Sequence, residues 1–307
     1  MQKTVDAPDP GFHLKTLLIV GVGLIGGSLA MALKKAGVVD RVIGFGRSET
    51  NLNKALALGA IDEVGDDLGV AASQADLICV ATPVNTMAAL FEIIAAHMKS
   101  TAIVTDVGSV KAGVVAQARL AMKHNVGHFV PGHPIAGKEK SGVEAAMPGL
   151  FENHKVVLTP LPENQPEQIV FMRSMWRICG ADVIEMTIEA HDRVLSLTSH
   201  LPHVLAYATV QQLAQSEDRE SCYEMAAGGF YDFTRIASGD PDMWRDICLL
   251  NRKELLNQLR QYQSDLAHLT DLIEKGDGEK IKDIFLSSQK ARSVLVERRE
   301  RAPDMDS

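Results

Sequence analysis

The segment GHPIAGKEKSG, residues 132–142, places a histidine directly before a proline and between glycines. Pro134 fixes its own φ and restricts His133 to an extended conformation, while Gly132 and Gly137 let the backbone turn tightly. The sequence therefore predicts an imidazole held rigidly on a turn. A neutral imidazole, whose ordinary pKa is about 6.5, accepts protons near neutral pH. Proton transfer is the chemical interpretation, and bracing of a turn is the structural alternative.

A second group of polar side chains lies in TDVGSVK, a segment that ends a predicted strand with Ser109 and Lys111. Ser109 and His133 both follow predicted strands. We therefore expect them at the carboxyl edge of the sheet, where cofactors bind. Lys111 is either a functional cation or a surface charge at the start of a helix.

Two clusters in the second half of the chain could bind a substrate. SHLPH places His200 and His203 three residues apart, on one face of a helix, and GGFYDFTRIASGDPDMW adds Arg235 and Trp244 in a predicted loop. The histidines have no obvious third ligand, so no metal site is expected. The alternatives are helix packing for the histidines, an ion pair with Asp232 for Arg235, and a core or dimer contact for Trp244.

The elements that would position these residues begin with a glycine motif. Gly21, Gly23 and Gly26 form GxGxxG directly after the strand-like TLLIV and directly before a helical pattern. The first glycine makes the turn, the second lets a pyrophosphate approach the backbone, and the third lets helix pack on strand. Free N–H groups at the helix start would bind the phosphates. The sequence thus predicts a dinucleotide cofactor, with a ligand-free turn as the alternative.

The end of the second strand bears on the choice between NAD and NADP. An acidic residue there would bind the ribose 2′-hydroxyl, but the sequence reads GFGRSET, with Gly46 in that place and Arg47 and Ser48 after it. Asp40 precedes the strand and so lies at the wrong end. A guanidinium and a hydroxyl suit a 2′-phosphate, which favours NADP, although NAD stays possible. The residues predicted to bind the cofactor are Gly21, Gly23, Leu24, Ile25, Gly26, Arg47, Ser48, Thr82 and Ser109.

The pattern of elements changes near residue 186. Before it, short apolar runs alternate with helical patterns, which is typical of a parallel sheet with helices on both faces. After it, we expect one long helix kinked at Pro202, a second from Asp242, and a last from about residue 279 to 299. The predicted organisation is an α/β dinucleotide-binding (Rossmann-type) domain over 15–186, a helical substrate and dimerisation domain over 187–300, and flexible tails at 1–14 and 301–307.

The second long helix carries a seam of apolar residues at steps of four and three, as in a coiled coil. Its members are Leu255, Leu259, Tyr262, Leu266, Leu269 and Ile273. The seam is larger than one following helix can cover, so we predict a homodimer formed through the helical domain.

Composition excludes some classes of protein. The 307 residues carry a net charge of −8, which argues against general affinity for nucleic acid. The uncharged stretch 17–33 reaches the lower length for a membrane span, but its glycines indicate a turn between strand and helix. The cysteines at 79, 179, 222 and 248 are widely spaced, so we interpret them as buried thiols in a reducing, cytoplasmic compartment.

Five of these segments together resemble the prephenate/arogenate dehydrogenase family of tyrosine biosynthesis. GLIGGS, DVGSVK, GHPIAGKEKSG, SHLPH and FYDFTRIA with PDMW match in order over roughly residues 16 to 295. The resemblance implies a dinucleotide-binding domain followed by a helical dimerisation domain. It also implies oxidative decarboxylation of prephenate or arogenate, with hydride transfer to NAD(P), to give 4-hydroxyphenylpyruvate or tyrosine.

The resemblance gives His133 the role of proton acceptor for the substrate's ring hydroxyl, with Ser109 as a second hydrogen-bonding group. Arg235 would hold a substrate carboxylate through its planar fork. His203 and His200 would line the substrate side, Glu139 would gate or orient it, and Trp244 would cover it.

Two other functions remain open from the sequence. One is a 3-hydroxyacid dehydrogenase of similar two-domain plan, although its usual catalytic lysine has no clear counterpart here. The other is a redox-sensing regulator that binds NADP but catalyses no reaction. The presence of Ser109, His133 and Arg235 together argues against it. Nothing in the sequence decides between prephenate and arogenate.

Overall fold

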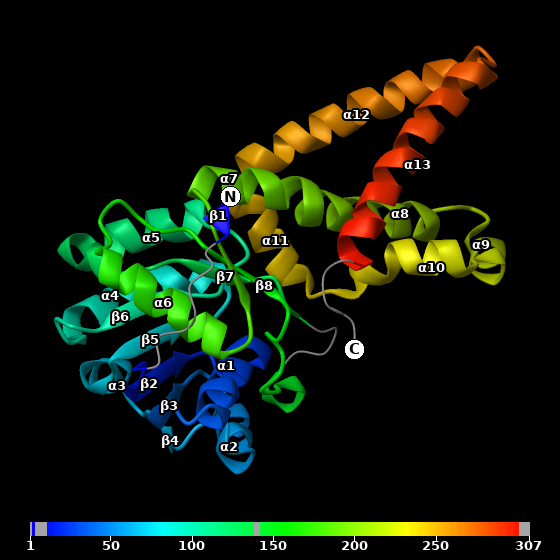
Figure 1. Ribbon diagram of the computed structural model, residues 1–307. Coiled ribbons are helices and arrows are strands. Elements are labelled where there is room, and N and C mark those ends of the chain that lie inside the picture. The colour runs from blue at the N-terminus through cyan, green and yellow to red at the C-terminus, as the bar shows by residue number, and fades with distance from the viewer. Residues whose placement is uncertain (1, 4–10, 138–141, 301–307) are drawn as a thin grey trace.

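The first part of the chain is built on a five-stranded parallel sheet in the computed structural model, which describes residues 2–3, 11–137 and 142–300 (Figure 1). Its strands lie in the order β4 (Glu63–Val64), β3 (Val39–Phe45), β2 (Leu14–Val20), β5 (Leu77–Val80) and β6 (Ile103–Asp106). The strand order changes direction beside β2, the position where ligands bind in open parallel sheets. The predicted α/β dinucleotide-binding fold is confirmed.

Helices cover both faces of this sheet because successive strand residues point to opposite sides. On β2, Leu17 and Ile19 pack on one face, while Leu18 and Val20 pack on the other. The first face is covered by α1 (Leu24–Lys35) and α6 (Pro166–Ile178), and the second by α3 (Leu68–Gln74), α4 (Met87–His97) and α5 (Ala112–Met122). No pattern noted in the sequence indicated α3, whereas α5 begins directly after Lys111, where a helix start was one of the two expectations. The remaining helices of this part are α2 (Glu49–Ala57) and the short η1 (Val84–Thr86), η2 (Lys123–His128) and η3 (Val143–Ala145).

A second, smaller sheet carries the histidine of GHPIAGKEKSG. It orders β1 (Gln2–Lys3), β9 (Asp182–Glu185), β8 (Lys155–Leu158) and β7 (Gly132–Pro134). His133 lies within β7, opposite Val157 of the antiparallel β8, so the prediction that it follows a strand on a turn is wrong. A parallel bridge between Val104 and Phe129 brings the chain just before β7 against β6.

The tail expected over residues 1–14 is wrong for the part of it that the structure describes, residues 2–3 and 11–14. Gln2 and Lys3 pair with β9, and Phe12 and Leu14 are buried in the core. The buried Phe12 side chain ties the residues just before β2 to the domain. The tail predicted for 301–307 and the site residue Glu139 lie outside the described residues.

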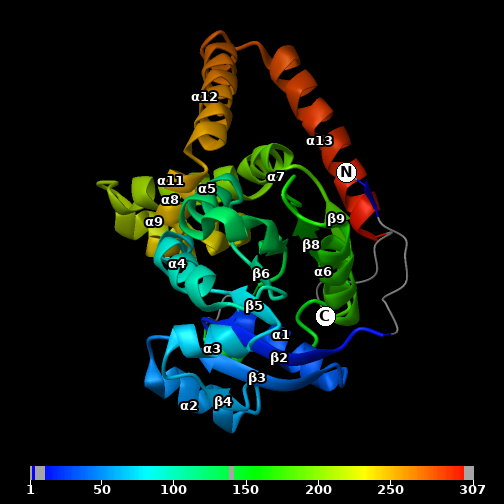
Figure 2. The same cartoon turned by 90° about the vertical axis from the view of Figure 1, so that its left-hand side faces the viewer.

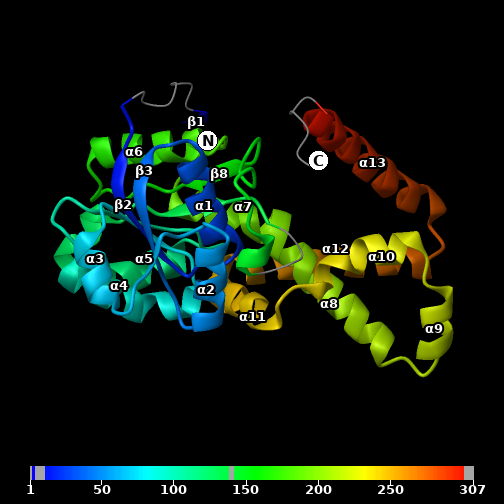
Figure 3. The same cartoon turned by 90° about the horizontal axis from the view of Figure 1, so that it is seen from below.

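The second part of the chain is helical from Thr187 onward. It contains α7 (Ile188–Leu195), the π-helical turn η4 (Ser196–His200), α8 (Leu201–Ala214), α9 (Arg219–Met225), α10 (Gly228–Thr234), η5 (Arg235–Ser238), α11 (Pro241–Leu250), α12 (Arg252–Glu274) and α13 (Gly278–Glu300). In Figures 2 and 3, α12 and α13 extend away from the sheet as two arms joined at one end.

Three local expectations for this part change. The irregularity near Pro202 is the π-helical turn just before it, which accommodates a ring that has no N–H and would crowd the preceding turn. The predicted loop around Arg235 is helical, in α10 and η5. The long helix from Asp242 is interrupted at Asn251, whose side chain bonds elsewhere, as described below.

The hydrophobicity of the helices and the burial of the cysteines can also be compared with the expectations. Among the described residues, no helix is long and apolar enough to cross a membrane. Cys79 and Cys179 are buried thiols, as expected, whereas Cys222 and Cys248 are only half-buried.

The packing of α1 on β2 gives a stability prediction. Gly26→Ala should lower the free energy of unfolding by up to about 2 kcal/mol. Overpacking usually costs about 1–3 kcal/mol, and replacing a helical glycine recovers roughly 1 kcal/mol of that. A Cβ at Gly26 would lie 2.5 Å from the Gly21 carbonyl oxygen and 2.7 Å from Cγ2 of Ile19. Gly23→Ala is the matched control, since no atom lies within 4 Å of a Cβ there. Equal losses for the two variants in urea denaturation would contradict this account.

Candidate active site

The glycine motif joins β2 to α1 in a form that suits a dinucleotide. Gly21 has φ +97°, in the left-handed region, and a Cβ on it would lie 2.6 Å from the Ala81 carbonyl oxygen. Gly23 faces open space, which leaves room for a ligand against the backbone. The first turn of α1, from Leu24, presents backbone N–H groups that lack intrahelical acceptors. A turn, an open approach and anion-binding N–H groups are the three features that a pyrophosphate requires.

The ends of the neighbouring strands lie beside this turn. Thr82 follows β5, accepts a hydrogen bond from the Thr86 hydroxyl at 3.0 Å, and would contact a Cβ on Gly21 through its methyl group at 2.9 Å. Arg47 and Ser48 follow β3 and are exposed. The Ser48 hydroxyl caps α2 by accepting from the Asn51 N–H at 3.2 Å, which leaves its own proton available. Asp40 bonds to His13 at 2.9 Å, far from these strand ends, as predicted.

A buried ion pair connects the loop of Ser109 to the strand of His133. Lys111 and Asp106 are both 0% exposed, and Lys111 Nζ lies 2.5 Å from Asp106 Oδ2. The ammonium also donates to the Gly132 carbonyl at 2.6 Å, while Asp106 accepts from the N–H groups of Gly132 at 3.2 Å and Gly108 at 2.8 Å. The interpretation of Lys111 as a surface charge is therefore wrong. The pair holds the peptide groups on both sides of Gly132, directly before His133.

His133 is the first member of a chain of three buried side chains. His133 Nδ1 lies 2.8 Å from His191 Nε2, and His191 Nδ1 lies 2.7 Å from Asp192 Oδ1. Asp192 also accepts hydrogen bonds from the backbone N–H groups of Lys111 at 2.8 Å and Ala112 at 2.9 Å, at the start of α5. This series of hydrogen-bonded side chains therefore joins the two parts of the molecule through β7, α7 and α5.

His191 and Asp192 are site residues that the sequence did not lead us to predict. Their only signal is an imidazole and a carboxylate side by side in EAHDR, near the start of a predicted helix. That helix could not be placed against His133 without the tertiary structure.

The buried histidines are poor proton binders in the ground state. Burial, with the nearby His191, Lys111 and His200, lowers the pKa of His133 well below 6.5. Burial likewise lowers the pKa of His191 and, against the attraction of Asp192, that of His200 to about 4. At neutral pH His133 is therefore an uncharged imidazole, and the ordinary histidine pKa expected from the sequence is corrected downward.

A second string of contacts leads from Asp192 to the predicted substrate residues. Asn251 Nδ2 donates to the Asp192 carbonyl at 2.9 Å and to His200 Nδ1 at 3.0 Å, which explains why the helix breaks at Asn251. Because the Asp192 carbonyl can only accept a hydrogen bond, the amide atom of Asn251 that faces it is assigned as the nitrogen. His200 then carries its proton on Nε2, which has no partner in hydrogen-bond geometry among the described residues. The Ser109 backbone is close enough to raise the pKa of His200, but burial outweighs this effect.

Trp244 links the two histidines of SHLPH. It is 9% exposed and lies edge-on to His200, with ring centroids 6.3 Å apart, and stacks on His203, with centroids 3.6 Å apart. Arg235 begins η5, which packs against α8, the helix of His203. Burial lowers the pKa of the half-buried His203, and the positive charge of Arg235 lowers it further. The structure thus brings His200, His203, Trp244 and Arg235 into one region that connects through Asn251 and Asp192 to His133. Glu139 is not among the described residues.

Two family models match the chain. The nucleotide-binding domain of prephenate dehydrogenase matches residues 29–185, and the dimerization domain of prephenate dehydrogenase matches residues 187–287.

Relatives match along most of the chain. A cyclohexadienyl dehydrogenase of Zymomonas mobilis is 36% identical over 283 residues, 92% of this chain and 96% of the relative. A prephenate dehydrogenase of Bacillus subtilis is 37% identical over 282 residues, 91% of this chain and 76% of the relative.

Solved structures agree with this assignment. Prephenate dehydrogenase of Aquifex aeolicus, in complex with hydroxyphenyl propionate and NAD+, has a TM-score of 0.87 and 34% identity, and the match covers 93% of this chain and 99% of that one. Arogenate dehydrogenase of Synechocystis has a TM-score of 0.78 and 31% identity, with 91% and 99% covered. With both domain models matched in order and such identities over nine-tenths of its length, the chain belongs to the prephenate dehydrogenase family.

Proposed function

We propose that the protein catalyses the oxidative decarboxylation of prephenate, arogenate or both, with hydride transfer to a nicotinamide dinucleotide, in tyrosine biosynthesis. The observation that carries this proposal is the buried, uncharged His133, held by the Lys111–Asp106 pair beside the strand ends that suit the cofactor. The relatives act as support, since their names include prephenate, cyclohexadienyl and arogenate dehydrogenases. We place the division between the two domains at Met186, between β9 and α7.

The chemistry of the substrate defines what the site must supply. Prephenate carries a hydroxyl on C4 of its ring and a carboxylate on C1. When the hydroxyl loses its proton, a hydride leaves C4 and CO₂ leaves C1, the ring becomes an aromatic phenolate. Return of a proton to the phenolate oxygen then gives the phenol of the product. The reaction needs a proton acceptor at the hydroxyl and a cation at a carboxylate, and the bound cofactor supplies the hydride acceptor.

We assign His133 as the proton acceptor. Its Nδ1 is occupied by His191, so Nε2 is the nitrogen left for a substrate hydroxyl. Ser109 is the second hydrogen-bonding group at that hydroxyl. Arg235 binds a substrate carboxylate, and His200, His203 and Trp244 form the surrounding wall. Glu139 keeps the proposed role of gating or orienting the substrate.

We assign the cofactor to the edge formed by Gly21, Gly23, Leu24, Ile25, Gly26, Thr82 and Ser109. The preference we propose is NADP, because Gly46 replaces the acidic residue that binds a ribose 2′-hydroxyl and Arg47 offers a cation to a 2′-phosphate. The Ser48 hydroxyl is the second polar group at that position.

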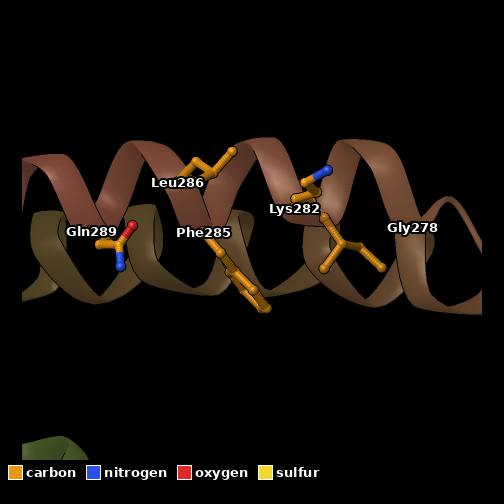
Figure 4. A pocket seen from close by; sticks show the side chains of 6 residues that line it. Gly278, Lys282, Phe285, Leu286 and Gln289 are labelled. Atoms are coloured by element: carbon orange, nitrogen blue, oxygen red, sulfur yellow. The ribbon is translucent and has the colours of Figure 1, made fainter.

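We propose a homodimer formed through the helical domain. Apolar side chains on α12 and α13 are exposed in the single chain, including Ile273 at 62%, Phe285 at 56% and Leu295 at 61%. Figure 4 shows the ring of Phe285 projecting from α13, beside a surface hollow lined by Ile281, Lys282 and Leu286. The match to a dimerization domain covers all of α12 and the start of α13, which supports a second copy as the partner.

His133→Asn tests the proposed reaction. The variant should keep the fold and cofactor binding but lower kcat by about 10²–10⁴, the usual contribution of a general base. The wild-type rate should fall only when the pH drops through the His133 pKa, well below 6.5, because the base must be unprotonated to act. The rate of the variant should not show this decrease at acidic pH. Reduced-nicotinamide absorbance with prephenate and with arogenate measures the rate, and a variant with normal kcat and the same pH profile would reduce His133 to a structural role.

Arg235→Gln is the contrasting variant. An interaction made equally in the ground and transition states appears mainly in KM. Arg235 is exposed in the single chain, and bound substrate would shield its charge pair from water. The loss should therefore raise KM for the substrate by an amount corresponding to about 2–4 kcal/mol, the scale for removing one partner of a buried charge pair, and leave cofactor affinity unchanged. An unaltered KM would remove Arg235 from the site.

Gly46→Asp tests the cofactor preference. A carboxylate there should repel a 2′-phosphate and accept from a 2′-hydroxyl, so the ratio of kcat/KM for NADP over NAD should fall by about 10-fold or more. The side chain can be accommodated, since the nearest atom to a Cβ at Gly46 is Cδ2 of Leu52 at 3.8 Å. Asn53→Asp adds the same charge on an exposed part of α2 and should leave the ratio unchanged. A wild type that already prefers NAD would refute the NADP preference.

Sedimentation equilibrium tests the assembly. The wild type should have twice the chain mass of 33.3 kDa at micromolar concentration, and Phe285→Glu should shift it toward the monomer. Leu120→Glu is the control, because Leu120 is 80% exposed on α5, outside the helical domain, and its replacement should leave the dimer intact. A monomeric wild type is incompatible with the proposal.

A further inference from the structure

We propose that Asp192, acting through His191, is a positioning residue that holds His133 in the one neutral tautomer able to accept a proton from the substrate. This inference rests on the proposed function of His133. It concerns two side chains that need not contact substrate or cofactor, since His191 is 0% and Asp192 2% exposed.

The direction of the hydrogen bonds follows from Asp192. Burial raises the pKa of this carboxyl, but hydrogen bonds from His191 and from the N–H groups of Lys111 and Ala112 outweigh burial and hold the pKa below its ordinary value. The carboxylate is therefore ionised and can only accept hydrogen bonds. At 2.7 Å from Asp192 Oδ1, His191 Nδ1 must carry the proton.

The tautomer of His191 in turn determines the tautomer of His133. Burial is the largest of the causes that lower the pKa of His191, so the ring is neutral and its Nε2 is unprotonated. That nitrogen lies 2.8 Å from His133 Nδ1, so the bond between the rings requires the proton to be on His133 Nδ1. The opposite tautomer would place two unprotonated nitrogens against each other. His133 Nε2 consequently has a free lone pair.

The side chains of His191 and Asp192 also compensate the positive charge that His133 acquires when it takes up a proton. The proton of the substrate hydroxyl moves to His133 Nε2, the O–H bond breaks, and the ring becomes an imidazolium that still donates through Nδ1 to His191. A buried positive charge is costly, and the Lys111 ammonium is already a cation near His133. The Asp192 carboxylate, one histidine away, is the negative charge that offsets it. His191 and Asp192 should therefore affect kcat more than KM.

Side-chain tautomers can be measured without any turnover. In protein labelled with ¹⁵N-histidine, long-range ¹H–¹⁵N correlation distinguishes Nδ1–H from Nε2–H rings, and the signals absent from His133→Asn and His191→Gln identify the two residues. The expected result is Nδ1–H for both rings at neutral pH. A His133 ring protonated on Nε2 in the wild type would overturn the proposal, whatever the enzyme's activity.

Two substitutions at His191 then test the consequence for catalysis. His191→Leu removes the acceptor and should lower kcat by roughly 10- to 100-fold, as for other groups that orient a functional imidazole, with little change in KM for the cofactor. His191→Gln retains a carbonyl oxygen that can accept from His133 Nδ1 and should recover part of the rate. Equal kcat for the wild type, His191→Leu and His191→Gln would contradict the proposal.

A control separates positioning from stability. Leu195→Ala opens a cavity on the same helix α7, where Leu195 is 9% exposed, and should lower the melting temperature while keeping kcat and the pH profile of the wild type. If Leu195→Ala lowers kcat as much as His191→Leu, the effect is a general loss of packing and the proposal fails. A wild type without dehydrogenase activity would instead refute the proposed function, while the tautomer measurement would still decide the proton positions.

Discussion

The ion pair between Lys111 and Asp106 is the contact on which the geometry of the site depends. Both groups are removed from water, a cost that a pair recovers only when its remaining hydrogen bonds are satisfied. Here they are satisfied by the backbone, through the Gly132 carbonyl and the N–H groups of Gly108 and Gly132. The side chains therefore fix the Ser109 loop and the His133 strand relative to each other. Removing one partner would strand a buried charge at the point where both segments meet.

Asp192 extends this arrangement across the division between the two parts of the chain. It lies on α7, binds the first N–H groups of α5, and reaches His133 through His191. In the proposed reaction, the base His133 of the nucleotide-binding part is thus oriented by the helical part. One hydrogen-bonded network therefore connects the proposed cofactor side to the proposed substrate side, at the junction of the two parts of the chain.

The sequence allowed the sheet and the glycine turn to be predicted because each depends on local rules, whereas the roles of the site residues stay predictions. GxGxxG needs only its neighbours, and alternate residues of TLLIV pack on opposite faces as the pattern indicated. The failures involve long-range contacts. Lys111 is buried because a partner five residues earlier and a strand 21 residues later close around it. Asn251 breaks a helical pattern because its amide bonds to residues 51 and 59 positions away.

The chain has a net charge of −8 and the proposed substrates are acids, so the proposed site must supply positive charge locally. Burial keeps His133, His191 and His200 neutral, so the imidazoles add hydrogen-bonding groups without adding positive charge. Lys111 is neutralised locally by Asp106, with a second carboxylate at Asp192. In the proposed reaction, Arg235 is then the cation at the carboxylate, while His133 becomes positive only on receiving the proton. Charge thus appears at the base during the reaction instead of before it. Interactions that grow in this way lower the barrier rather than merely strengthen substrate binding.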